Sequence, residues 1–172
     1  MKNICKFTNP SLHSPLLVSC FVMETNTETM KRNAALKEHR MILVIQGEGI
    51  FRFNDQAFRC CSGTLIFGFE SEAFSVEQIQ DTIYMYIGFS GGRADDLLHR
   101  FHIHKGNRII NGYDGLIPFW RDSLSHADEN TVDLASESIL LYSFSRLTSR
   151  ATQYGNVVSR ILEIAEESFN DP

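Results

Sequence analysis

Three side chains suited to binding a small polar molecule alternate along one stretch of the chain. Thr82, Tyr84 and Tyr86 occupy every second position, and such positions share one face of a β-strand. A tyrosine offers a flat apolar ring and one hydroxyl, which fits a polar molecule with C–H-rich faces, such as a sugar. The alternative is that both rings only fill the protein core.

Arg32 is a second candidate, because it lies in a polar segment just before the main apolar region. Its guanidinium carries donors in a fork that matches the hydroxyls or the carboxylate of a ligand. The alternative is a solvated arginine on the protein surface.

The sequence contains no familiar catalytic motif: there is no Gly-rich phosphate loop, no Gly-x-Ser-x-Gly and no pair of catalytic carboxylates. The nearest approach to a metal site is His99, His102 and His104. No carboxylate or cysteine accompanies them at ligand spacing, and basic residues lie among them. We interpret them as exposed loop histidines and expect neither a metal nor a cofactor.

Composition narrows the classes of protein. The 172 residues are 43% hydrophobic, enough for a substantial core, and carry a net charge of −5. A chain without a basic face should bind nucleic acid poorly. No segment approaches the roughly 20 apolar residues of a membrane span, and the N-terminus does not read as a signal peptide. We therefore expect a cytoplasmic protein without a membrane partner.

The elements that would position the tyrosines are short strands. Residues 41–69 predict four strands joined by three turns, at 46–49, 54–56 and 62–63. Since no helix-length crossover separates these strands, the pattern indicates an antiparallel barrel or sandwich.

Further strands are predicted at 16–23, 74–76 and 82–89. The last of these has two different faces, because an apolar row alternates with the tyrosines and suits packing beneath helices. The row consists of Ile83, Met85, Ile87 and Phe89. We expect the tyrosines to face the interior of the barrel.

Helical periodicity follows at 93–101, 114–126, 133–150 and 156–169. The third helix is apolar around much more than one face, so it needs cover on more than one side. We predict that one side packs on the chain itself and the other forms a dimer interface. The candidate interface residues are Ile139, Leu140, Leu141, Phe144 and Leu147.

The run 42–98 resembles the ligand-sensing cupin domain of AraC-family bacterial transcription regulators. The likeness rests on the ordered motifs Gly-Glu-Gly at 47–49, Ser-Gly-Thr at 62–64, in place of the family's Pro-Gly-Asp-like turn, and Phe-Ser-Gly at 89–91. The resemblance implies a mainly β fold with C-terminal helices: a cupin-like antiparallel β-barrel followed by a helical dimerisation segment. It also implies a small-molecule effector, most simply a carbohydrate, a homodimer, and DNA contact only through a C-terminal helix-turn-helix domain that this chain does not contain.

Single positions follow from the same resemblance. Arg32 falls where the arabinose sensor has a pocket arginine, and Tyr84 and Tyr86 lie on the strand that supplies ring-bearing pocket residues. Phe74 stands where metal-dependent cupins carry a histidine, so the resemblance implies a barrel without a metal site. The candidate ligand-binding residues are thus Arg32, Phe74, Thr82, Tyr84 and Tyr86.

We expect a barrel with an N-terminal arm over 1–92, a helical dimerisation segment over 93–152, and a linker with the first helix of a truncated DNA-binding domain over 153–172. Two alternatives remain open. One is a metal-free cupin-fold sugar isomerase or epimerase that uses Tyr84 or Tyr86 as acid or base. The other is a dimerisation module that binds no ligand.

Overall fold

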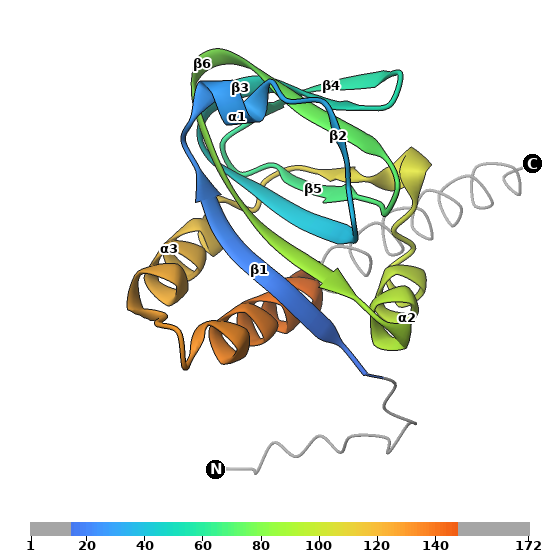
Figure 1. Cartoon of the computed structure of the whole chain (residues 1–172), viewed down its shortest axis with the longest axis vertical. Coiled ribbons are helices and arrows are strands. Elements are labelled where there is room, and N and C mark those ends of the chain that lie inside the picture. Colours follow the sequence, from blue (N-terminus) through green and yellow to red (C-terminus); the bar gives the residue numbers. More distant parts are fainter. Residues whose placement is uncertain (1–14, 148–172) are drawn as a thin grey trace, which may run out of the picture.

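The computed structural model describes residues 15–147 (Figure 1). The strands are β1 (Leu17–Glu24), β2 (Ala34–Ala35), β3 (His39–Phe53), β4 (Gln56–Cys61), β5 (Leu65–Gly68), β6 (Ala73–Ser90) and β7 (Ile109–Ile110). The helices are α1 (Thr27–Met30), α2 (Gly92–Arg100), α3 (Ile117–His126) and the 3-10 turns η1 (Lys105–Asn107) and η2 (Asp114–Leu116). Residues 132–147 are also helical, up to the end of the described part.

Two long strands, β3 and β6, form the centre of the fold and pair antiparallel over most of their length. β1 and β5 extend one end of this pair and β4 and β2 extend the other. Because both long strands curve, the two ends of the sheet face each other around an interior (Figure 1). This arrangement confirms the predicted cupin-like antiparallel β fold with helices after it.

The predicted turn at 46–49 is wrong, because β3 continues through it. Gly47 has a φ of +69° but serves a bulge, where the register between β3 and β6 shifts. A Cβ at Gly47 would lie 1.9 Å from the carbonyl oxygen of Gln80, so only glycine allows β6 to approach this closely. The segments predicted as two strands at 74–76 and 82–89 are likewise one strand, β6, which contains Asp81 at a φ of +33°.

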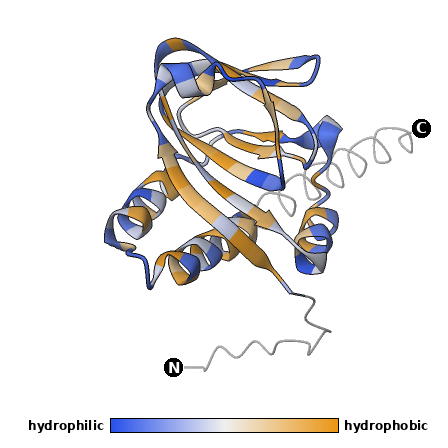
Figure 2. Cartoon of the chain, viewed as in Figure 1, coloured by the Kyte–Doolittle hydropathy of each residue, from blue (hydrophilic) through white to orange (hydrophobic). Residues whose placement is uncertain are grey.

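Hydrophobic side chains form two clusters, one on each face of the sheet. The inner cluster, between the two ends of the sheet, consists of Met30, Leu36, Ile42, Val44, Phe51, Phe53, Cys60, Ile66, Phe74, Val76 and Tyr84. The outer cluster lies between the sheet and the helices and includes Phe21, Met41, Leu43, Met85, Ile87, Phe89, Leu97, Leu98, Trp120, Leu140 and Phe144. Figure 2 shows hydrophobic residues along the strands and hydrophilic ones in α1.

The helices cover the outer face, as predicted. In α3, Trp120 is fully buried, meets Phe21 of β1 edge-on at 5.6 Å between ring centroids, and donates from Nε1 to Ser143 Oγ at 2.9 Å. Phe144 packs against the rings of Phe67 and Phe101 at 5.7 and 5.4 Å. These contacts join α3 and residues 132–147 to the same core.

The structure corrects the predicted dimer interface. Four of its residues, Ile139, Leu140, Phe144 and Leu147, are buried in the outer cluster, and Leu141 is half-buried against it. The helix buries this broad face on its own chain, so those side chains have little surface left for a partner. Its exposed face instead carries Leu134, Ser138 and Tyr142, spaced i, i+4 and i+8. Among residues 15–147 no helix is long and apolar enough to cross a membrane.

Two expectations fall on parts of the chain outside the described residues. They are the N-terminal arm, except for its last residue, and the segment 153–172 with its predicted helix at 156–169. Both stay predictions.

Candidate ligand-binding site

A cavity of about 190 Å³ opens at one end of the inner cluster. Its walls come from β1, α1, the segment that runs from Arg32 through β2 to Leu36, and the inner faces of β3 and β6. The short helix α1 is capped by Asn26, whose side chain accepts a hydrogen bond from the backbone N–H of Glu28 at 2.9 Å. This cap fixes α1 and the segment after it over the cavity.

Four of the five predicted ligand-binding residues meet at this cavity: Arg32, Phe74, Tyr84 and Tyr86. The alternation in β6 puts the tyrosines on the inner face, while Met85 packs on the outer cluster. The predicted orientation of this strand is therefore confirmed. Whether these side chains bind a ligand stays a proposal.

Thr82 does not line the cavity. Its side chain is buried near the bulge between β3 and β6, and its hydroxyl donates to the backbone carbonyl of Glu48. The register between β3 and β6 shifts between Ile83 and Tyr84, so Thr82 and the tyrosines lie on opposite sides of this irregularity. Its hydroxyl thus joins the two long strands.

Aromatic rings form one wall of the cavity. Tyr84 lies 6.2 Å from Tyr86 and 6.4 Å from Phe74 between ring centroids. Burial raises the pKa of Tyr84, and the charge of Glu24 adds to that effect. Burial also raises the pKa of Tyr86, against the influence of Arg40. Both phenols are therefore neutral near pH 7, and neither hydroxyl makes a hydrogen bond within residues 15–147.

Arg40 is a cavity residue that the sequence analysis missed. Its Cζ lies 4.3 Å from the ring centroid of Tyr86 and 5.8 Å from that of Phe74. Its Nε is buried without a hydrogen-bond partner in the described part of the chain. The signal was present, because Arg40 precedes Ile42 and Val44 in the same inward alternation, but the strand was predicted to begin only at Met41.

The model of the AraC-like ligand binding domain matches residues 22–145, which include both long strands and the cavity. The chain belongs to this family. An AraC-like domain of this kind is found in transcription regulators, so the resemblance drawn from the sequence motifs is confirmed.

The comparison with solved structures found chains of low sequence identity. An apo variant of ToxT from Vibrio cholerae strain SCE256 has a TM-score of 0.51 and 11% identity, covering 83% of this chain and 56% of that one. ToxT from strain O395 bound to (E)-4-(8-methylnaphthalen-1-yl)but-3-enoic acid has a TM-score of 0.47, 12% identity and coverages of 83% and 57%. An RmlC-like cupin from Methanocaldococcus jannaschii has a TM-score of 0.35 and 10% identity, covering 56% of this chain and 95% of that one.

This AraC-like chain spans a little over half the length of the ToxT chains. The comparison with curated proteins returned no match.

A second cavity lies on the other side of the sheet, between β1, β6 and α3. It measures about 410 Å³ and is mostly apolar, with Met23, Ile83 and Leu124 in its wall and Arg121 beside them. None of the predicted ligand-binding residues faces it.

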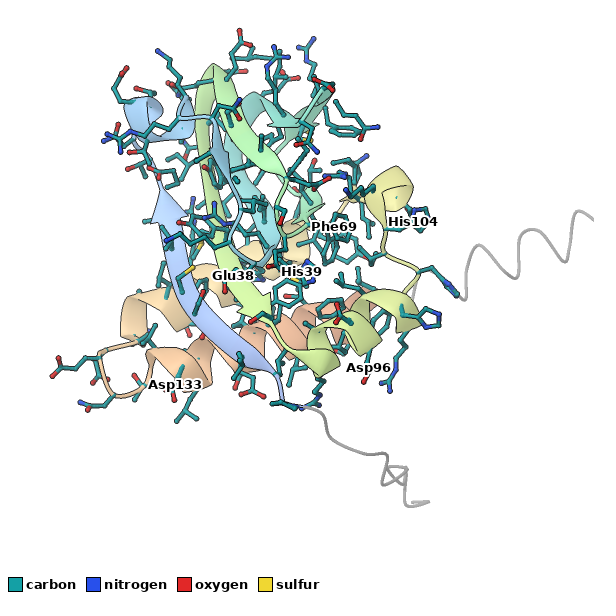
Figure 3. All side chains as sticks on the ribbon, turned by 45° about the vertical axis from the view of Figure 1, so that its right-hand side comes forward. Glu38, His39, Phe69, Asp96, His104 and Asp133 are labelled. Carbon is teal, nitrogen blue, oxygen red and sulfur yellow. The ribbon has the colours of Figure 1, made fainter. Side chains whose placement is uncertain are left out.

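The histidines considered as metal ligands are exposed, and Figure 3 shows His104 at the surface. Within residues 15–147 no group of three or more histidine, cysteine, aspartate or glutamate side chains is placed to share a metal ion. The described residues therefore offer no candidate metal site.

Proposed function

We propose that this AraC-like domain senses an effector and dimerises within a bacterial transcription regulator. The effector is a small polar metabolite, most simply a carbohydrate, bound without a metal in the 190 Å³ cavity. The observation that carries the proposal is that Arg32, Phe74, Tyr84 and Tyr86, predicted separately, line one cavity. DNA contact would belong to a C-terminal helix-turn-helix domain of the regulator, and the regulator acts in the cytoplasm.

The size of the cavity supports a small effector. Its volume is below the roughly 300–1,000 Å³ of sites for drug-sized ligands and equals the liquid volume of about six water molecules. A monosaccharide is of that order. The rings of Tyr84 and Tyr86 offer faces for C–H groups, and their unpartnered hydroxyls offer hydrogen bonds.

β6 provides the route from the cavity to the helices. Tyr84 and Tyr86 face the cavity, while Met85 between them and Ile87 after them pack in the outer cluster with Trp120. A shift of this strand on binding therefore moves side chains under α3 and residues 132–147. Effector binding would change helix packing and so the placement of attached DNA-binding domains.

Exposed aromatic residues on the helices support a homodimer. Phe119 is 51% exposed and Tyr142 38% exposed, and their rings lie 5.3 Å apart between α3 and residues 132–147. Leu134, on the same helical face as Tyr142, is 64% exposed. A second copy that covers this patch would remove apolar surface from water.

The raised pKa of Tyr84 supports a sensor over an isomerase or epimerase. A general base works best when its pKa lies near the operating pH. Glu24, the carboxylate in the cavity wall, already accepts a hydrogen bond at Oε1 from the backbone N–H of Asn26 at 2.8 Å. The cavity is better arranged for binding than for proton transfer.

The test is a thermal-shift screen of the chain against neutral and acidic monosaccharides, since a ligand that binds only the folded state raises the melting temperature. For any ligand found, Tyr86→Ala should weaken binding at least tenfold by calorimetry. Ile79→Ala is the matched control, because Ile79 is exposed on the same strand away from the cavity. A screen without any shift would contradict the proposal.

The dimer is tested by sedimentation of Phe119→Ser against Ile79→Ser, which removes an exposed apolar side chain from β6. We expect the first variant to raise the dimer dissociation constant at least tenfold and the second to leave it unchanged. Equal effects, or a wild-type chain that stays monomeric at high concentration, would refute this interface.

A further inference from the structure

We propose that the effector carries a carboxylate and that Arg40 binds it, so that the ligand is a sugar acid or a polar carboxylic acid of similar size. This inference rests on the proposed function and narrows its ligand class. Arg40, which was not among the ligand-binding residues predicted from the sequence, would then select acidic over neutral ligands.

The state of the Arg40 guanidinium is the first step. Its Cζ lies over the Tyr86 ring, 4.3 Å from the centroid, which is an attractive contact. Nε is buried and unpartnered, and within residues 15–147 no ion pair or side-chain hydrogen bond involves Arg40. A buried donor without a partner is costly. Because protein atoms cover Nε, a ligand oxygen would bond to the terminal nitrogens Nη1 and Nη2, which are not buried in this way.

The nearby carboxylates do not fill this role. Glu24 accepts from the backbone N–H of Asn26, as described above. Glu38, labelled in Figure 3, accepts a hydrogen bond from Ser19 Oγ of β1. Neither lies within 4.0 Å of the Arg40 guanidinium. The arginine thus has no internal counter-ion at contact distance.

The balance of charge favours one negative group. Arg32 and Arg40 line the cavity against a single carboxylate, that of Glu24. Arg32 also lacks an ion pair within the described part of the chain. A monoanion completes this balance, whereas a phosphate dianion would add a second charge close to Glu24 and take more of the 190 Å³.

Geometry also favours a carboxylate. A planar carboxylate accepts two parallel hydrogen bonds from a guanidinium edge. The pairing partners of Arg40 on the two neighbouring strands are Gly68 and Gly88. The side chains of Leu36, Phe53, Ser19 and Glu38 fill the space beside these glycines, so a carboxylate would bind on the side of the guanidinium that faces the cavity. The rest of the ligand would then lie along Tyr84 and Tyr86.

The experiment compares matched pairs by calorimetry on the whole chain: D-glucuronate with D-glucose, and D-galacturonate with D-galactose. D-glucose 6-phosphate tests the other anion. We expect at least one acid to bind tenfold or more tightly than its neutral partner. Arg40→Gln should abolish that preference, and Arg40→Lys should keep part of it by retaining the charge without the fork. Arg52→Gln, an exposed arginine paired with Glu77 outside the cavity, is the control and should leave it intact.

The other outcomes of this experiment distinguish the carboxylate inference from the proposed function. Neutral sugars that bind as tightly as their acids would overturn this inference and leave the proposed function standing. A preference for the phosphate would overturn the carboxylate, and an acid preference that survives Arg40→Gln would overturn the role of Arg40. If no compound binds, both the inference and the proposed function fail.

Discussion

Two arginines touch the aromatic inner cluster, and they differ in what surrounds their charge. Arg108 is 1% exposed, and its guanidinium donates two hydrogen bonds of 2.8 Å to the carboxylate of Glu72, while its Nε donates to the carbonyl of Lys105 at 3.1 Å. It lies over the ring of Phe53 at 4.6 Å. Arg40, over Tyr86, is half-buried and has no such partner.

We interpret Arg108 as a charge that stabilises the fold and Arg40 as a charge that is available to a ligand. A buried ion pair needs good geometry and further hydrogen bonds. Here each guanidinium nitrogen of Arg108 and each carboxylate oxygen of Glu72 has a hydrogen-bond partner. The rings of Phe53 and Phe74 lie 5.1 Å apart between the two arginines, so both occupy one aromatic environment. What distinguishes them is the presence of a carboxylate. The fold supplies it to Arg108, and we expect the effector to supply it to Arg40.

The largest expected effect comes from breaking the complete pair. Arg108→Met leaves the buried Glu72 carboxylate with only the exposed Lys105, 3.5 Å away, and the N–H of Phe69 as partners. The loss of the buried guanidinium should lower the free energy of unfolding by about 3–5 kcal/mol. Urea unfolding followed by the fluorescence of Trp120, the single tryptophan, measures this. Arg52→Met breaks an exposed pair with Glu77 and should cost at most about 1 kcal/mol. Equal losses would mean that burial of the pair does not matter.

The pair should also make stability depend on pH. Burial alone would raise the pKa of Glu72, but the hydrogen bonds from Arg108 and from the Phe69 N–H, with the charges of Arg108 and Lys105, lower it overall. A lowered folded-state pKa gives stability that is present above the unfolded value, about 4.3, and is lost as the pH falls through the folded value.

The reference for this dependence is the double variant Arg108→Met/Glu72→Met, which lacks the titrating carboxylate. As the pH falls from about 7 to about 3, the unfolding free energy of the wild type should fall relative to that of this variant. A difference that stays constant over this range would show that Glu72 is not held ionised by its partners.

Arg40→Met tests the other arginine and should have a smaller effect. Since no carboxylate or carbonyl is left unpaired, we expect the free energy of unfolding to change by less than about 1 kcal/mol, and to rise rather than fall. The same urea experiment without ligand measures this. A loss comparable to that of Arg108→Met would mean that Arg40 is structural, and would erase the contrast between the two arginines.

The sequence predicted the fold class well but misjudged its two longest strands. The turn at 54–56 was found because its neighbours pair with each other within a few residues. Gly47 is also a glycine with a positive φ, but its conformation accommodates the close approach of Gln80, more than 30 residues away in the sequence. A turn and a bulge look alike until the distant partner is known.

The site shows the same limit. The inward orientation of Tyr84 and Tyr86 could be predicted because it follows from the alternation of polar and apolar residues along one strand. Arg40 was missed because its importance depends on Tyr86 in another strand and on the lack of an ion-pair partner among residues 15–147. The helix predicted at 133–150 is present over 132–147, the part that the structure describes. Which of its faces is covered depends on rings such as Phe67 and Phe101 from other elements.

The smallest expected effect concerns the hydroxyl of Tyr84. A buried hydroxyl bonded within the protein contributes about 1 kcal/mol, but this one makes no hydrogen bond within residues 15–147. Tyr84→Phe should therefore change the free energy of unfolding by less than about 0.5 kcal/mol. Ser143→Ala, which deprives the indole N–H of Trp120 of its acceptor, should cost about 1–3 kcal/mol.

In Tyr84→Phe, as expected for Arg40→Met, the affinity for the effector should change while the free energy of unfolding stays nearly constant. If the hydroxyl is kept free for the effector, its removal should weaken effector binding by calorimetry while urea unfolding stays unchanged. A variant that loses stability without losing affinity would place the hydroxyl among the structural groups, beside Arg108. The polar groups of the cavity would then support the fold, as Glu72 does at the other arginine.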